Sequence, residues 1–122
     1  MKTILVTAFA LTVAITSCKK NSDAPVVSIT SPVNNSSIVL GDSIHIEGKL
    51  TDDKSLHEAA IYVMSPGEDT VLKDYPYVHE KKTHSYHYHY KPDSLGVYLL
   101  QVIAEDHDGN TTIVARNFSV TP

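Results

Sequence analysis

The sequence has no tryptophan, one cysteine, and no long apolar run beyond residue 15. A lone cysteine cannot form an internal disulfide bond, so a hydrophobic core of Ile, Val, Leu and Tyr must hold the fold together. Basic residues are also few, with 10 Lys and Arg against 14 Asp and Glu, and the formal charge is −4. A chain of this charge has no net positive field to attract nucleic acid, so we expect no nucleic-acid partner.

The apolar run near the N-terminus extends from Ile4 to Ile15, behind the positive charge of Lys2. A run of about 10–14 apolar residues is too short to span a bilayer comfortably and is typical of the hydrophobic region of a signal peptide. A buried core helix is the alternative. The position at the N-terminus, behind a lysine, favours the signal peptide.

The end of this run and the three residues after it resemble the bacterial lipobox, with Ile15, Thr16 and Ser17 before Cys18. The resemblance implies cleavage before Cys18 and acylation of its thiol, which would account for a single cysteine in an exported chain. A free or intermolecular thiol is the alternative. We therefore expect a signal peptide at residues 1–17, a lipidated cysteine and tether at 18–24, and a folded domain at 25–122.

This organisation implies a chain held at a membrane through its lipid, in the cell envelope. In related lipoproteins the residues just after the cysteine direct sorting. Lys19 is not the Asp that retains lipoproteins at the inner membrane in enteric-type systems, so the resemblance favours the outer membrane and leaves the leaflet open.

Short runs of strand-forming residues alternate with turn residues from Ala24 onward. Residues 34–37 are expected to form a polar loop, and Ser and Asp residues mark several of the turns. A helix is the alternative for residues 55–64, but Ile61, Tyr62 and Val63 favour a strand there. The pattern predicts an all-β sandwich of about seven strands, at residues 26–30, 43–51, 56–64, 70–73, 83–90, 97–105 and 111–120.

Three segments, residues 31–46, 50–56 and 95–110, resemble bacterial immunoglobulin-like domains. In the third, Leu95 and Tyr98 are similar to a tyrosine corner, in which the tyrosine hydroxyl fixes the preceding loop. The resemblance implies an immunoglobulin-like β-sandwich, in a small family of lipoproteins with no assigned function that often carry clustered histidines. It departs from antibody domains, because the Cys–Trp–Cys core is absent.

The most unusual segment is residues 83–90, where histidine and tyrosine alternate. In a strand, the tyrosines would share one face, and His87 and His89 the other. If this strand pairs with residues 43–51, the two histidines would lie beside His45 and Glu47, and such a group could bind zinc or copper. A solvated polar face over a tyrosine core is the alternative, and contact with an aromatic or cationic ligand is a third.

Two weaker patterns also predict sites. Acidic residues in loops at one end of the sandwich could bind calcium, although such residues also stabilise turns through their own backbone. These candidates are Asp52, Asp53, Asp106 and Asp108. Three Asp-Ser/Thr-aliphatic triplets are similar to an O-glycosylation motif of exported bacterial proteins, with Ser43, Thr70 and Ser94 as the acceptors.

No nucleophile elbow, zinc-protease helix or phosphate-binding loop is present, so we expect no enzyme activity. The sequence favours a non-catalytic, lipid-anchored binding or interaction module of the cell envelope, with an envelope protein or a glycan as partner. One alternative is a metal-binding lipoprotein that uses the histidine-rich strand for zinc or copper. Another is a structural accessory subunit of an envelope complex.

Overall fold

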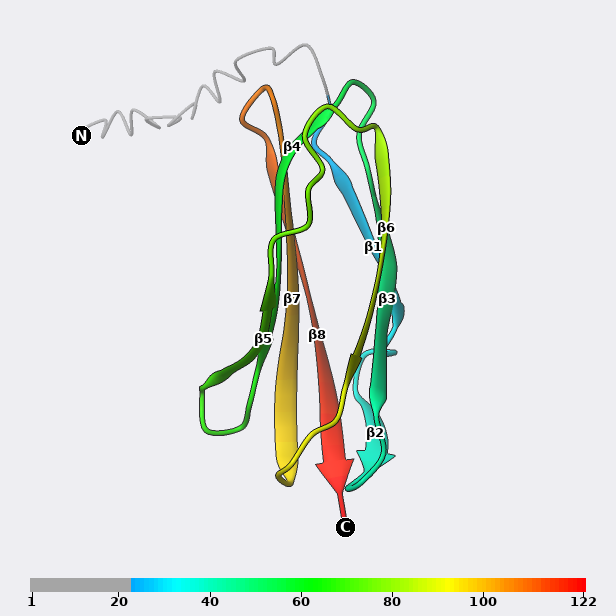
Figure 1. Cartoon of the computed structure of the whole chain (residues 1–122), viewed down its shortest axis with the longest axis vertical. Coiled ribbons are helices and arrows are strands. Elements are labelled where there is room, and N and C mark those ends of the chain that lie inside the picture. The colour runs from blue at the N-terminus through cyan, green and yellow to red at the C-terminus, as the bar shows by residue number, and fades with distance from the viewer. Residues whose placement is uncertain (1–22) are drawn as a thin grey trace, which may run out of the picture.

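The computed structural model describes residues 23–122, which form eight strands in two facing sheets (Figure 1). The first sheet has the order β1-β3-β6, with β1 at Val26–Ser31, β3 at Ile44–Thr51 and β6 at Thr83–Tyr90. The second has the order β2-β8-β7-β4-β5, with β2 at Ser36–Val39, β8 at Thr111–Thr121, β7 at Gly96–Asp106, β4 at Leu56–Met64 and β5 at Thr70–Asp74. The expected all-β sandwich is confirmed. The predicted signal peptide and Cys18 lie outside the described residues.

One strand was not expected from the sequence, and it brings the expected count of about seven strands to eight. Ser36 and Ser37 belong to β2 rather than to a polar loop, and β2 pairs in parallel with the end of β8. This edge strand has only four residues, and they do not alternate between polar and apolar, so the sequence alone does not indicate a strand here. The strand forms because β8 supplies its hydrogen-bond partners. The backbone N–H of Asn35 donates to the carbonyl of Asn117 at 2.7 Å and starts this pairing.

The core lies between the two sheets, and the predicted alternation of faces is confirmed. Ile46 and Leu50 of β3 are fully buried, as are Ile61 of β4 and Leu100 of β7. Residues 56–64 are a strand, so the alternative of a helix is wrong. The apolar side of each strand therefore faces inward, which leaves the outer faces for polar side chains.

The tyrosine corner expected at Tyr98 is present. Its hydroxyl donates to the carbonyl of Ser94 at 2.9 Å, and its ring stacks on Phe118 with centroids 5.2 Å apart. Leu95 is exposed, so the tyrosine corner is formed by the buried ring of Tyr98 and the hydrogen bond of its hydroxyl.

Tyr86 of β6 contacts both other strands of the first sheet. Its ring passes over Gly48 of β3, and its hydroxyl donates to the carbonyl of Ser28 in β1 at 2.8 Å. Burial raises the pKa of Tyr86 to about 12. Burial and a hydrogen bond to Asp74 also raise the pKa of Tyr88. Tyr86 is buried in the core and Tyr88 packs against it, so the tyrosine face of β6 is the core face. The histidine face of the same strand must therefore point outward.

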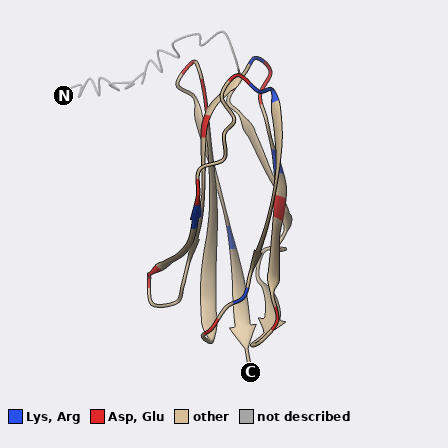
Figure 2. Ribbon diagram, viewed as in Figure 1, with Lys and Arg blue, Asp and Glu red and all other residues tan. Residues whose placement is uncertain are grey.

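The described chain begins at the end of the sandwich that carries the β3–β4 loop and the β7–β8 turn (Figure 1). The C-terminus and the β2–β3, β4–β5 and β6–β7 connections lie toward the other end. Acidic and basic residues are interspersed along the ribbon, mainly in the loops (Figure 2). Residues 23–122 contain no helix long and apolar enough to cross a bilayer.

Candidate metal centres

The first candidate centre lies on the outer face of β3 and β6, near the end where β3 begins and β6 ends. These strands are antiparallel, and their register pairs His45 with His89 and Glu47 with His87. Directly opposite residues on one face have Cβ atoms about 4.5–5.5 Å apart. The register therefore places three imidazoles and one carboxylate at the corners of a small rectangle, and we call His45, Glu47, His87 and His89 the sheet site.

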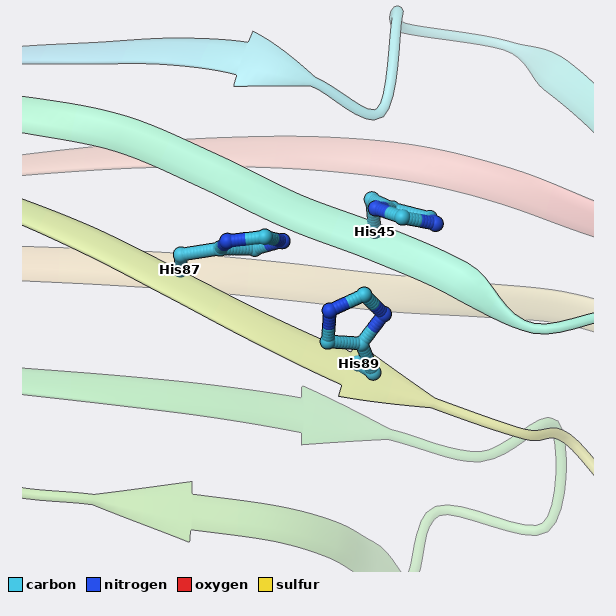
Figure 3. Close-up of side chains that lie close together, drawn as sticks. All are labelled: His45, His87 and His89. Atoms are coloured by element: carbon cyan, nitrogen blue, oxygen red, sulfur yellow. The ribbon is translucent and has the colours of Figure 1, made fainter.

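The three imidazoles of the sheet site lie close together over β3 and β6 (Figure 3). The ring centroids of His45 and His89 are 4.3 Å apart, and those of His87 and His89 are 4.5 Å apart. Each ring offers a nitrogen atom, and these three nitrogens lie within 4.8 Å of one another. In a tetrahedral zinc site, with Zn–N bonds near 2.0–2.1 Å, ligand nitrogens are about 3.4 Å apart, so small side-chain rotations would bring them to an ion.

Glu47 supplies the negative charge at the sheet site. Its Oε1 lies 3.0 Å from Nε2 of His87 and 3.8 Å from Nδ1 of His45. A carboxylate in this place could be a fourth ligand, or could accept a hydrogen bond from a ligand imidazole and so hold the ring in position. The side chains of His45 and His87 are about half exposed, at 53% and 50%, so an ion could enter from solvent.

A second group of imidazoles, which the sequence did not predict, lies at the other end of the sandwich. His57, His79 and His107 also bring one ring nitrogen each within 4.8 Å of the others. They are 22 and 28 positions apart along the chain, so no local pattern joins them. Six of the seven histidines thus lie in two groups of three. The seventh, His84, lies apart from both, and burial and nearby Lys81 lower its pKa.

The four acidic candidates for calcium do not form such a group within residues 23–122, where both clusters of three potential ligands consist of histidines. Asp52 Oδ2 accepts the backbone N–H groups of Lys54 and Ser55 at 3.0 and 2.9 Å. Asp106 Oδ1 accepts those of Asp108 and Asn110 at 2.9 and 2.8 Å. Asp52 and Asp106 therefore stabilise their own loops, and calcium binding stays a prediction.

The three predicted glycosylation acceptors lie at the end of the sandwich away from Asp23, in or beside its connections. Ser43, Thr70 and Ser94 are all exposed. The hydroxyl of Ser94 lies 2.8 Å from the hydroxyl of Tyr98, so it takes part in the tyrosine corner. Ser43 and Thr70 are therefore the more accessible of the three, and their modification also stays a prediction.

A family model described as a bacterial Ig domain matches residues 25–115. Solved structures agree on the fold. The fibronectin(III)-like modules of CbhA from Clostridium thermocellum match at 21% identity and TM-score 0.55, over 78% of this chain and 94% of theirs. No curated protein matches the chain.

Two further similar structures are a CARDB domain from Pyrococcus furiosus, solved with di-metal ions, and CopC from Methylosinus trichosporium OB3b. The CARDB domain matches at 11% identity and TM-score 0.57, over 82% of this chain and 89% of that one. CopC matches at 14% identity and TM-score 0.51, over 80% and 95%. The chain also matches parts of larger proteins, and spans 20% of an engineered protein and 16% of a β-glucosidase from Listeria innocua. At these identities the likeness shows the fold alone.

Proposed function

The chain belongs to the bacterial Ig domain family, and from this premise we propose that it is a non-catalytic, lipid-anchored module of the cell envelope that binds zinc or copper at the sheet site. The Ig-like fold is typical of binding and accessory modules, and bacterial Ig domains are usually extracellular or associated with the envelope. The sandwich provides the scaffold, and the ligands come from the outer face of β3 and β6.

The observation that carries the proposal is the meeting of three imidazoles on two paired strands. Their ring nitrogens lie within 4.8 Å of one another, and Glu47 lies 3.0 Å from the nearest ring. Imidazole nitrogen suits both zinc and copper, and a carboxylate beside the rings offsets part of the charge of a divalent ion. The two β-strands hold all four side chains in fixed register, which reduces the entropy lost on binding.

The lipid anchor is supported by the lipobox-like residues before Cys18. The described domain starts at the end of the sandwich opposite to the sheet site (Figure 1). A domain tethered by Cys18 would therefore hold the sheet site away from the membrane and open to the surrounding solution. The CARDB domain solved with di-metal ions has a similar fold, but the imidazoles of this chain are what would bind an ion here.

Isothermal titration with zinc and then copper tests the proposal on the purified, untagged chain. We expect uptake of either ion at the sheet site, and His87→Ala should remove one equivalent. His84→Ala is the matched control, since His84 lies on the same strand but on its tyrosine face. If the wild-type chain takes up neither ion, or if His87→Ala takes up as much as wild type, the proposal is wrong. Comparison of the two ions at equal pH shows which one the site prefers.

A further inference from the structure

The three histidines missing from the sequence prediction lie where three separate parts of the chain meet. His57 is near the start of β4, His79 is in the connection between β5 and β6, and His107 is in the turn between β7 and β8. The ring centroids of His57 and His107 are 4.5 Å apart, and those of His79 and His107 are 4.7 Å apart. We call His57, His79 and His107 the loop site.

A β-bulge directs His57 toward the loop site. Across β4 and β7, Leu56 pairs with Asp106 and Glu58 pairs with Glu105, so His57 is the extra residue on β4. Leu56 and Ala59 are both buried in the core. They are three positions apart, and in a regular strand residues at that spacing would point to opposite faces. The bulge accommodates this spacing, and His57 at the bulge is partly buried.

Backbone hydrogen bonds hold the connection that carries His79. The N–H of Glu80 donates to the carbonyl of Leu56 at 2.9 Å, and the N–H of Leu56 donates to the carbonyl of Lys81 at 2.7 Å. Val78, next to His79, is buried in the core. The backbone on both sides of His79 is thus fixed against the start of β4.

The turn that carries His107 is also ordered by its own bonds. The N–H of Asp106 donates to the carbonyl of Asn110 at 3.0 Å, and the amide group of Asn110 donates to Oδ2 of Asp106 at 2.9 Å. All three imidazoles therefore stand on backbone that is already fixed before any ion arrives. Such preorganisation lowers the cost of binding.

His57 provides a second, independent observation. Its Nδ1 is buried and has no hydrogen-bond partner among the described residues. A buried polar atom without a partner is destabilising, and a bound cation is one partner that an imidazole nitrogen can take. Carboxylates lie close by: Glu58 Oε1 is 3.9 Å from Nε2 of His57, and Glu80 Oε1 is 3.7 Å from Nε2 of His79. Their charge would favour a cation at this place.

We infer that the loop site is a second zinc site, independent of the sheet site and at the opposite end of the sandwich. Three neutral imidazoles would bind the ion, and the fourth position of a tetrahedron would stay open for water or for a neighbouring carboxylate. The site borders an open hollow lined by Tyr75, Tyr77 and Val78, so the ion would be reached from solvent. Binding would join β4, the β5–β6 connection and the β7–β8 turn.

The loop site goes beyond the proposed function, and the two can fail separately. Native mass spectrometry and titration with zinc chloride count the ions on the purified, untagged chain. We expect two zinc ions on wild type, one on the variant with His45→Ala, His87→Ala and His89→Ala, and one on the variant with His79→Gln and His107→Gln. His84→Gln is the control and should keep two.

The loop-site variant changes an exposed turn residue and a half-buried loop residue, and leaves His57 in place. Far-ultraviolet circular dichroism checks its fold, and His107→Gln alone, at the exposed position, should still weaken binding at least tenfold. If wild type binds zinc but the sheet-site variant binds none, or if the loop-site changes leave that count unchanged, the loop site is refuted while the sheet site stands. If wild type binds no zinc, both sites are refuted. If only the loop-site changes lose an ion, the sheet site fails instead.

Discussion

Gly48 lies in the central strand of the first sheet, against Ser28 of β1 and Tyr86 of β6. A Cβ atom at this position would lie 2.1 Å from the carbonyl oxygen of Ser28 and 2.2 Å from the hydroxyl oxygen of Tyr86. The first of these is backbone that cannot rotate away, so Gly48→Ala would separate β1 from β3 or displace Tyr86. We expect a loss of at least about 2 kcal/mol in the free energy of unfolding, measured by urea titration.

Gly67→Ala is the control for this prediction. Gly67 lies in an exposed connection, where the nearest atoms to an added Cβ are 3.8 Å away. We expect it to change the free energy of unfolding by less than about 0.5 kcal/mol. Equal stability of the two variants would contradict the packing described for Tyr86.

Tyr86 also predicts a dependence of stability on alkaline pH. Burial raises the pKa of Tyr86 from the ordinary 10.0 to about 12, so the folded state keeps its proton where the unfolded state loses it. The stabilisation is complete below pH 10 and is lost as the pH rises from 10 toward 12. Thermal melting at pH 9, 10 and 11 should show falling stability in wild type and a smaller fall in Tyr86→Phe. An identical fall in both would show that Tyr86 does not contribute.

Among the strands, the sequence predicted the faces well because burial imposes a period of two. Ile44, Ile46 and Leu50 alternate with polar residues in β3, and the structure buries all three. Once β3 and β6 are neighbours, the same period places His87 and His89 outside, where the register brings them to His45. The sheet site was therefore within reach of sequence reasoning.

The loop site was beyond it, because its residues meet only through tertiary packing. The sequence predicted that the start of β4 and the β7–β8 turn lie at the same end of the sandwich, which could bring His57 near His107. His79 lies in the irregular residues 75–82, whose path depends on the burial of Val78 and on bonds to Leu56. The sequence did not predict β2 for a similar reason, since this strand forms only by pairing with the edge of β8.

The register of β3 and β6 predicts that moving one histidine along β6 weakens metal binding and leaves the fold intact. Exchanging two outward residues of β6, as Ser85→His with His87→Ser, keeps the composition but moves one imidazole two positions along the strand, about 6.6 Å. That imidazole would then lie opposite Lys49 instead of Glu47. We expect at least a tenfold weaker affinity of the sheet site for zinc by titration, with an unchanged circular dichroism spectrum. Wild-type affinity would mean that the register does not position the ligands.

For the molecule as a whole, the proposed lipid anchor would decide where the sandwich works. Cys18→Ser should leave the chain without acyl groups and release it from the membrane fraction, because the proposed anchor depends on this thiol. Intact mass spectrometry of the chain from its native host measures the acyl mass, and fractionation measures release. Detection of Cys18→Ser in the membrane fraction at the wild-type level would argue against the anchor.

Anomalous diffraction at the zinc absorption edge, from crystals of the untagged chain grown with zinc, would show whether His45, His87 and His89 bind one metal ion on the outer face of the first sheet. We predict a peak within bonding distance of one nitrogen from each of the three rings, at about 2.0–2.1 Å. A well-ordered sheet site with no anomalous peak between its imidazoles would show that these three residues do not bind zinc.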